Sequence, residues 1–257
     1  MSIIISVMIA VTIGLVLYMW SEAHRDRVRI EELAFKRLPR SFHRLKIFFI
    51  SDIHRRLLSS DIVETWRGRV DFVIIGGDLC ERGVKWERIE ENLKRLTSLA
   101  KTTFFVWGNN DLEVDLNELR SLFQKYGIIE LDNKVKEIER NGEKIAIAGV
   151  DERSLLRSVS AACDRTFSIL VCHDPDLAKT LTEPHPFSLI LSGHTHGGQI
   201  RFFRWGLKEK GTLHKRATYA HLISNGYGTS LIPLRLGAPA EMHILILKRI
   251  IEKMGRE

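Results

Sequence analysis

The sequence predicts an α/β domain preceded by one N-terminal transmembrane helix. A long uncharged segment comes first, and from Leu45 onward short apolar runs alternate with amphipathic stretches. The 257 residues are 44% apolar and 28% charged, which excludes a wholly disordered polymer and a multi-spanning membrane protein. Three cysteines at unrelated spacings indicate neither a disulfide framework nor a cysteine zinc site, and they fit a reducing compartment.

The first 21 residues have the length and composition of a membrane anchor. No charged residue or His lies between Ser2 and Ser21, and at about 1.5 Å per residue such a helix is about 30 Å long. Tyr18 and Trp20 occupy positions where interfacial aromatic residues are typical. A cleaved signal peptide and a buried core helix are the alternatives, but the segment lacks a positive start and a small-residue end. We therefore expect residues 1–21 to be a retained anchor.

The chain immediately after this segment is basic. Residues 22–46 carry +4 of the total formal charge of +7, and no Lys or Arg precedes the anchor. The positive-inside rule then predicts a single-pass protein of the cell membrane with its catalytic domain in the cytoplasm. Residues 22–43 are expected to be a juxtamembrane segment, either a merely solvated helix face or a face lying against anionic headgroups.

From residue 44 to residue 257 the pattern predicts one catalytic-sized domain. Apolar runs predict buried strands, and apolar residues at helical spacing predict helices between them. Asn141-Gly142 predicts a hairpin. Two late segments, 217–224 and 241–248, alternate like antiparallel strands and are separated by a loop rich in Gly and Pro. The expected strands are Leu45–Ile50, Phe72–Ile75, Thr103–Val106, Phe167–Val171 and Phe187–Leu191, and the expected helices are Val84–Leu99 and Val114–Tyr126.

Polar side chains follow each of the five expected strands. In open α/β sheets the carboxyl ends of the strands line the ligand crevice. A single Asp or His at a strand end is more often a turn former or a helix cap, but five strands that deliver such residues to one rim point to a ligand site. These residues are Asp52 and His54, Asp78, Asn109 to Asp111, His173, and His194 and His196.

The order of these motifs, Asp-x-His, Gly-Asp, Gly-Asn-x-Asp, His and Gly-His-x-His, resembles the calcineurin-like metallophosphoesterase superfamily. The match covers about residues 44–248. The segments GHTHGGQI and NGYGTSLIPLRLGAPAE look like a membrane-anchored or exported subgroup that includes proteins similar to UDP-2,3-diacylglucosamine pyrophosphatases. The resemblance implies a four-layer α/β/β/α sandwich in which two mixed sheets pack face to face.

The resemblance also implies two divalent metal ions. Imidazole, carboxylate and amide oxygen suit Mn, Fe, Zn or Co, and two ions about 3.5–4 Å apart would activate a water that attacks phosphorus in line. Position by position, Asp52, His54, Asp78 and His196 would bind one ion, and Asp78 would bridge to a second ion completed by Asn109, His173 and His194.

The residue after the ligand Asn departs from the family pattern. It is typically a His that protonates the leaving oxygen or orients the phosphate, but here it is Asn110, and an amide cannot hand over a proton. General acid catalysis is worth about 10²–10⁴-fold, so we expect pyrophosphates or other activated esters to be preferred over alkyl phosphates. Asp111 could be the acid instead, if burial raises its pKa.

Arginines at two places in the chain are candidate substrate-binding residues. Arg55 and Arg56 follow the first metal motif and either hold a substrate phosphate or lie in an exposed loop. Arg235, within the late Gly- and Pro-rich loop, resembles a position near the pocket in the subgroup.

The favoured function is a membrane-anchored phosphohydrolase acting on a phospholipid or a lipid-linked nucleotide. A nucleotide phosphodiesterase or nuclease is one alternative, but outside residues 22–46 the chain is only +3, so no nucleic-acid partner is expected. A non-catalytic metal-binding scaffold is another. The exact substrate, the native metal and the oligomeric state stay open.

Overall fold

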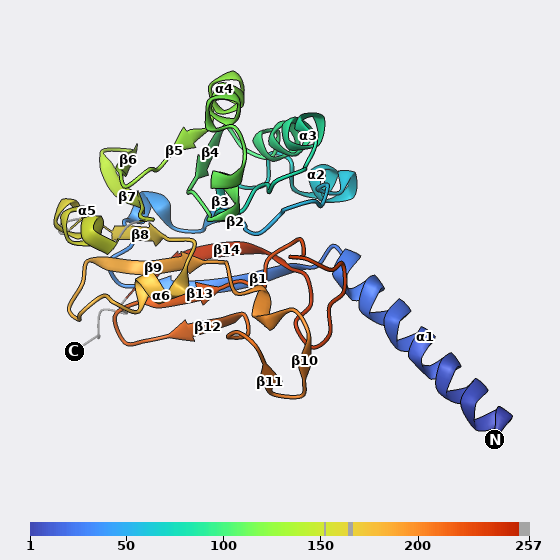
Figure 1. Ribbon diagram of the computed structural model, residues 1–257. Coiled ribbons are helices and arrows are strands. Elements are labelled where there is room, and N and C mark those ends of the chain that lie inside the picture. Colours follow the sequence, from blue (N-terminus) through green and yellow to red (C-terminus); the bar gives the residue numbers. More distant parts are fainter. Residues whose placement is uncertain (152, 164–166, 252–257) are drawn as a thin grey trace.

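The protein is a sandwich of two six-stranded sheets with helices on both outer faces, as the sequence resemblance implied (Figure 1). The computed structural model describes residues 1–151, 153–163 and 167–251. The expected domain end at residue 257 therefore lies outside the described residues.

The first sheet has the strand order β1-β14-β2-β3-β4-β5. β14 runs antiparallel to β2 and parallel to β1, and β2 to β5 are parallel to one another. β2 and β3 have the predicted bounds, and β4 begins one residue earlier than predicted. The strands are β1 (Val28–Phe35), β2 (Leu45–Ile50), β3 (Phe72–Ile75), β4 (Thr102–Phe105), β5 (Ile129–Glu130) and β14 (Met242–Arg249).

The second sheet has the order β12-β13-β9-β8-β7-β6. The hairpin of β6 and β7 is confirmed: Asn141 and Gly142 both adopt positive φ, at 53° and 76°, as its two-residue turn requires. The late segments do form strands, but in different sheets: β13 runs parallel to β9, whereas β14 joins the first sheet. The strands are β6 (Val135–Arg140), β7 (Glu143–Gly149), β8 (Phe167–Val171), β9 (Phe187–Ser192), β12 (Thr212–Lys215) and β13 (Ala220–Ile223).

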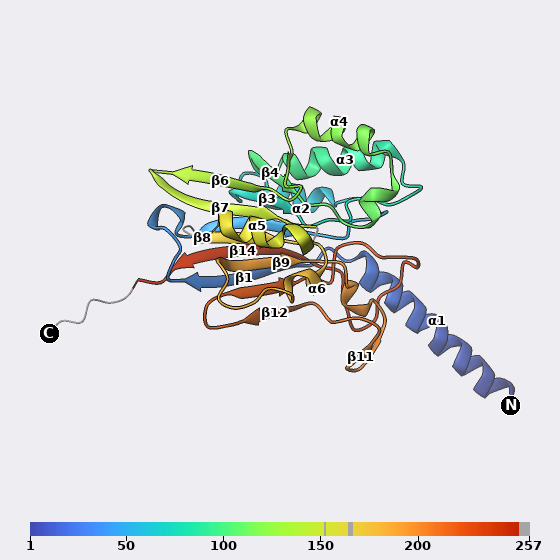
Figure 2. The ribbon, with the colours of Figure 1, turned by 60° about the vertical axis from the view of Figure 1, so that its left-hand side comes forward.

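Helices α2, α3 and α4 cover the first sheet, and α5 and α6 lie beside the second (Figures 1 and 2). The observed α3 and α4 lie within the two predicted ranges. Asp115 caps α4 by accepting hydrogen bonds from two backbone N–H groups of its first turn. The helices are α1 (Ser2–His24), α2 (Ser60–Trp66), α3 (Trp86–Thr97), α4 (Leu116–Tyr126), α5 (Leu156–Ala162) and α6 (Pro175–Ala178). The short 3-10 turns are Arg40–Phe42, Asn110–Glu113, Arg153–Leu155 and His196–Gly198, and a small ribbon joins β10 (Arg201–Phe202) to β11 (Trp205–Gly206).

Strand β2 shows how the apolar core fixes the layers. Because side chains alternate across a strand, Ile47 and Phe49 pack between the sheets, whereas Phe48 and Ile50 pack toward the helices that cover the first sheet. Both faces of β2 are therefore buried, and its register cannot slip without exposing one apolar set. This holds the residues that follow β2 at a defined point on the rim.

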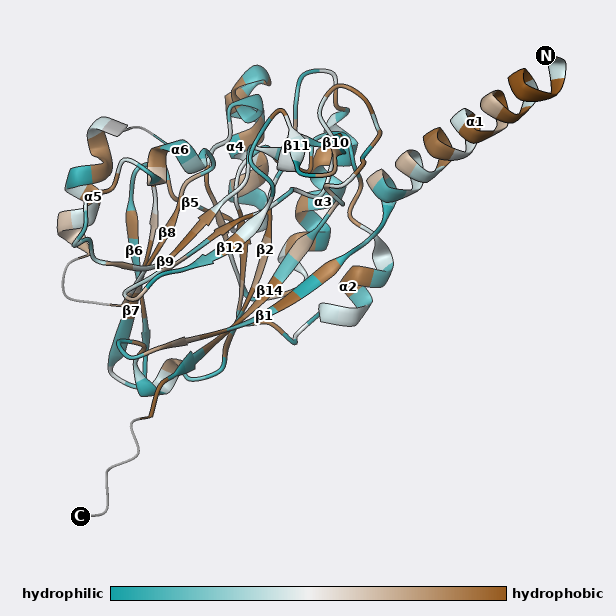
Figure 3. Ribbon diagram, turned by 90° about the horizontal axis from the view of Figure 1, so that it is seen from below, coloured by the Kyte–Doolittle hydropathy of each residue, from teal (hydrophilic) through white to brown (hydrophobic). Residues whose placement is uncertain are grey.

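Helix α1 projects from the body and is apolar over most of its length, with the polar residues Ser21, Glu22 and His24 at its carboxyl end (Figure 3). Met19, Glu22 and Ala23 are its only buried residues, and the helix is long and apolar enough to be a candidate membrane span.

The boundary expected at residue 44 does not separate the basic segment from the domain. Residues 28–35 form β1, which pairs along its full length with β14. The sequence of this segment shows mainly its basic charge because β1 is an edge strand, with few buried side chains. Leu33 and Phe35 are buried, while Arg29 and Glu32 are exposed.

Candidate metal centre

The seven candidate ligands lie together where the carboxyl ends of strands from both sheets meet. β2, β3 and β4 supply residues from the first sheet, and β8 and β9 supply residues from the second. Asp52, His54 and Asp78 are essentially unexposed, His173 and His196 are buried, and His194 and Asn109 are more open to solvent.

The side chains form two candidate metal-ligand clusters. Asp52, His54 and His196 make up one, and Asp78, His173 and His194 the other, with the ligand atoms of each within 4.8 Å of one another. In the first, the Nε2 atoms of His54 and His196 lie 3.0 Å apart. In the second, Nε2 of His173 lies 3.2 Å from Oδ2 of Asp78.

Asp78 lies between the clusters. Its Oδ2 is also 3.6 Å from Nε2 of His54, so one carboxylate oxygen approaches a histidine of each set. Asn109 extends the second cluster, because its Oδ1 lies 3.0 Å from Nδ1 of His194.

The donor set fits divalent cations. The two Nε2 atoms of His54 and His196 point at each other, an arrangement that a shared cation explains better than a nitrogen–nitrogen hydrogen bond. Burial lowers the pKa of His196 to about 4, so its imidazole is neutral at pH 7 and has a lone pair to offer.

The second cluster behaves as an ion pair. Burial by itself lowers the pKa of His173, but its contact with Asp78 raises that pKa to about 10. Burial by itself raises the pKa of Asp78, but His173 and His54 hold it well below its usual value. A cation bound here would replace the positive charge of the protonated imidazole.

The backbone around the clusters is strained. Asp52, His54, Asp78, His194 and His196 all adopt left-handed φ between 49° and 68°, a conformation that costs of order 1–3 kcal/mol for residues other than Gly. Two glycines make room for the carboxylates. A Cβ on Gly108 would lie 2.2 Å from Oδ1 of Asp78, and one on Gly193 would lie 2.5 Å from Oδ2 of Asp52. Such concentrated strain is typical of a functional site.

Hydrogen bonds orient two of the histidines. Nδ1 of His54 lies 2.9 Å from Glu81, and Nδ1 of His173 lies 2.8 Å from the carbonyl oxygen of Gly76, so both rings direct Nε2 into the centre. Sequence reasoning missed Glu81, because no motif marks a carboxylate three residues after Asp78.

Comparison with known proteins identifies the family. A model for the calcineurin-like phosphoesterases matches residues 45–198, which include the two clusters. The chain belongs to the calcineurin-like phosphoesterase family. It is accordingly a metal-dependent phosphoesterase.

Three relatives and one solved structure illustrate what the chain is similar to. The uncharacterized protein YpbG of Bacillus subtilis is 47% identical over 209 residues, which cover 79% of this chain and 81% of YpbG. An uncharacterized metallophosphoesterase of Helicobacter pylori is 32% identical over 79% of this chain, which spans only 60% of that relative. A transmembrane protein with metallophosphoesterase domain from Danio rerio is 28% identical over 85% of this chain and 56% of its own length. The Haemophilus influenzae NAD nucleotidase superposes with a TM-score of 0.53 at 15% identity, over 72% of this chain and 50% of that chain, a likeness of fold alone.

Asn110 of this phosphoesterase is hydrogen-bonded to the candidate ligand Asp78. Its backbone N–H and its side-chain amide both donate to Asp78, at 2.8 and 2.6 Å. Asp111 is fully buried, and its carboxylate accepts from the backbone N–H groups of Asp78, Cys80 and Gly108. Burial and the charge of Asp78 do raise its pKa to about 7. Even so, Asp111 organises the loops under the site and has no surface from which to serve a leaving group.

Arg235 is not a substrate-binding residue. Its side chain is fully buried and donates to the backbone oxygens of Asn225, Gly228 and Ala238 at 2.6 to 2.9 Å. The same guanidinium lies 3.3 Å from Nδ1 of His196. It therefore positions a candidate ligand, a role hidden from the sequence because the two residues are 39 positions apart.

Arg55 stays a candidate for contact with substrate. Its side chain is 66% exposed at the rim, and it is paired with Glu81. A cavity of about 520 Å³ adjoins it, lined also by Arg88, Tyr227 and the end of α1 at Ala23 and His24.

Two arginines fasten α1 to the loops of the metal centre. Arg56 donates to the carbonyl oxygens of Ala23 and His24, and the backbone N–H of Arg235 donates to the carbonyl oxygen of Met19 at 3.0 Å. The metal-centre rim therefore lies beside the last turn of the apolar helix.

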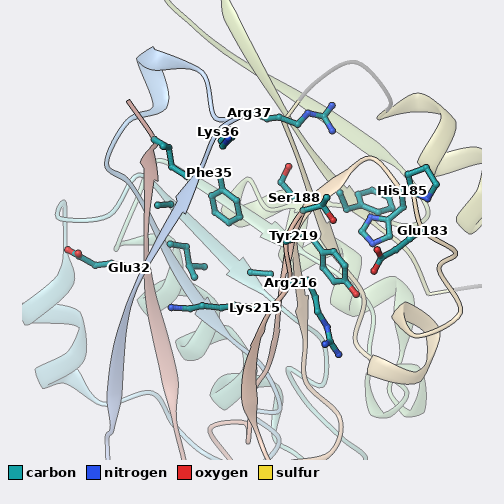
Figure 4. A pocket seen from close by; sticks show the side chains of 18 residues that line it. Glu32, Phe35, Lys36, Arg37, Glu183, His185, Ser188, Lys215, Arg216 and Tyr219 are labelled. Atoms are coloured by element: carbon teal, nitrogen blue, oxygen red, sulfur yellow. The ribbon is translucent and has the colours of Figure 1, made fainter. Parts of the chain in front are cut away.

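A larger cavity, of about 860 Å³, lies at the opposite edge of the sandwich (Figure 4). It is lined by the end of β1 and by the amino ends of β9 and β13, including Phe35, Ser188 and Tyr219. None of the candidate metal ligands contributes to it, so it is separate from the phosphoesterase site.

Proposed function

We propose that this metallophosphoesterase is a membrane-anchored phosphohydrolase with two metal ions, whose site faces the lipid surface from the cytoplasm. The observation that carries the proposal is the position of Asp78, whose Oδ2 approaches His54 of one ligand cluster and His173 of the other. A carboxylate between two ligand sets is the arrangement that a pair of cations requires.

The ligand sets follow from the clusters. Asp52, His54 and His196 would hold one ion, His173, His194 and Asn109 the other, and Asp78 both. When bound, two divalent cations of Mn, Fe, Zn or Co would supply Lewis acidity at the phosphoryl group and an activated water nucleophile. The chain's own part is orientation, because Glu81 and the Gly76 carbonyl hold the imidazoles of His54 and His173 with Nε2 directed inward, and Arg235 lies against Nδ1 of His196.

The leaving-group side of the site favours activated substrates. Asn110 can donate a hydrogen bond but not a proton, and Asp111 has no exposed surface. A phosphate leaving group departs without protonation far more readily than an alkoxide does. We therefore infer a preference for pyrophosphate or other activated ester bonds.

The substrate is inferred to be a phosphorylated lipid or a lipid-linked nucleotide. The cavity between the metal rim and the end of α1 supports this inference, because Arg55 and Arg88 offer cationic groups for a phosphate there. A substrate held in the bilayer would reach this cavity with much of its orientation already set. The charge of +4 in residues 22–46 favours a cytoplasmic position for the domain.

The test is hydrolysis of bis-p-nitrophenyl phosphate by the detergent-solubilised full chain with Mn²⁺, together with the metal content of the protein. Asp78→Ala should abolish hydrolysis and lower the bound metal, whereas the matched control Asp61→Ala, at an exposed position of α2, should change neither. Hydrolysis by Asp78→Ala at the wild-type rate would refute the proposed site. A panel of lipid and nucleotide phosphates then identifies the substrate class.

A further inference from the structure

Six large apolar side chains protrude into solvent near the anchor helix. Their exposed fractions run from 46% to 99%, although a soluble surface normally buries or disperses such side chains. We call this set the interfacial surface; it consists of Phe202, Phe203, Trp205 and Leu207 in and beside the β10–β11 ribbon, and Leu231 and Ile232 in the loop before Arg235.

The two parts of the interfacial surface are joined. The Gln199 side chain donates to the carbonyl oxygens of Ser230 and Ile232, and the backbone N–H of Arg201 donates to the carbonyl oxygen of Leu236 at 2.8 Å. The ribbon and the loop therefore form one hydrogen-bonded unit.

This unit is also joined to the helix. The hydrogen bond from Arg235 N–H to the Met19 carbonyl sets the loop against α1, and the ribbon and α1 project from the same side of the molecule (Figures 1 and 2). Met19 lies between Tyr18 and Trp20, the aromatic residues expected at the membrane boundary. Leu231 and Ile232 thus lie close to the depth at which the helix would leave the bilayer.

The composition fits a lipid interface. Trp and Phe side chains favour the headgroup boundary, and the exposed Arg204, Lys208 and Lys210 beside them can contact anionic headgroups. Phe203 and Leu231 also adopt left-handed φ, at 53° and 63°, which is unusual for bulky side chains and here displays them outward.

We propose that the interfacial surface inserts into the headgroup region of the bilayer that α1 spans, as a second membrane contact. The inference rests on the proposed anchoring by α1. Only residues 197–200 separate His196 from the ribbon, so this contact would hold the rim of the metal centre against the membrane at a fixed tilt.

The experiment uses the full chain in vesicles of phosphatidylcholine and phosphatidylglycerol. Cys80, Cys163 and Cys172 are buried, so a fluorophore attaches selectively to a cysteine introduced at the surface. The test positions are Phe203→Cys and Leu231→Cys. Ile9→Cys in the helix is the positive control, and Ile251→Cys, apolar and 76% exposed at the other end of β14, is the matched negative control.

Vesicles containing doxyl-labelled phosphatidylcholine should quench the fluorophore at positions 203 and 231 as well as at position 9. The fluorescence at position 251 should not be quenched. Quenching at position 9 alone would overturn the inference while the anchor stands. Quenching at none of the four would overturn the anchor and the inference with it. A blue-shifted emission at position 203 without lipid quenching would indicate contact with a second copy of the chain, and would equally overturn the inference.

Discussion

Replacing Arg235 by Met should destabilise the protein severely, because the guanidinium is fully buried and supplies the donors for several loop carbonyls. Burial lowers its pKa only to about 10, so the side chain is charged at pH 7. Arg235→Met would leave the carbonyl oxygens of Asn225, Gly228 and Ala238 without these donors. Each buried acceptor left without a donor costs about 1–3 kcal/mol, so the three carbonyls together set an upper limit of about 9 kcal/mol on the loss in the free energy of unfolding. We expect about 3–5 kcal/mol, because loop carbonyls can turn partly toward water.

The assay is urea denaturation of the wild type, Arg235→Met, Arg235→Lys and the exposed control Arg69→Met. Arg235→Lys keeps the positive charge but loses the planar set of guanidinium donors. Its free energy of unfolding should therefore lie between those of the wild type and Arg235→Met. The control should stay within about 0.5 kcal/mol of the wild type. Affinity for Mn²⁺ should fall in both Arg235 variants, because the guanidinium also contacts Nδ1 of His196. A decrease of less than about 1 kcal/mol in the free energy of unfolding of Arg235→Met would refute this role of the buried guanidinium.

Three further outcomes follow from individual contacts. Glu81→Gln should weaken Mn²⁺ binding by about 10–100-fold in a metal titration, because the carboxylate orients His54, and unchanged affinity would contradict that role. Asn110→His should raise the hydrolysis rate most for esters with poor leaving groups, and an equal effect on all leaving groups would count against a missing acid. Burial lowers the pKa of His221 to about 4 and of His243 to about 3, from 6.5, so the unfolded chain binds these protons first. The urea midpoint of the wild type should therefore fall as the pH drops from about 6.5 to about 4, and the midpoint of His221→Gln should fall less. A midpoint that does not depend on pH would refute this contribution of the buried histidines.

The strands that carry the site could be predicted because they are buried on both faces. Leu45–Ile50, Phe72–Ile75 and Phe167–Val171 are apolar except for Lys46 and Ser168, and each ends at the predicted residue. The polar residue that follows such a run must lie on the rim, so sequence position alone brings Asp52, Asp78 and His173 to one edge. The family resemblance then predicted the second sheet and the division of the side chains into two candidate ligand clusters.

Other features depend on contacts between distant parts of the chain, which local patterns do not encode. β1 has only two buried side chains, Leu33 and Phe35, and pairing with β14 stabilises it more than its own apolar pattern. Asp111 looks like a free acid in the sequence, but three backbone N–H groups from two loops surround its carboxylate. Arg235 looks like an anion-binding residue because nothing in the sequence shows that neighbouring carbonyls occupy its donors.

The attachment of α1 gives a physical reason to expect the site at the membrane surface. Arg56 lies two residues after His54 and binds the last carbonyls of the helix, where the helix dipole favours a cation. Arg235 binds the Met19 carbonyl through its backbone and His196 through its side chain. A displacement of the helix end would therefore pull on loops that carry a ligand from each of β2 and β9. Because the same groups hold the end of α1 and the candidate ligands, the orientation of the candidate metal centre relative to α1 is set by the fold and not by a flexible linker.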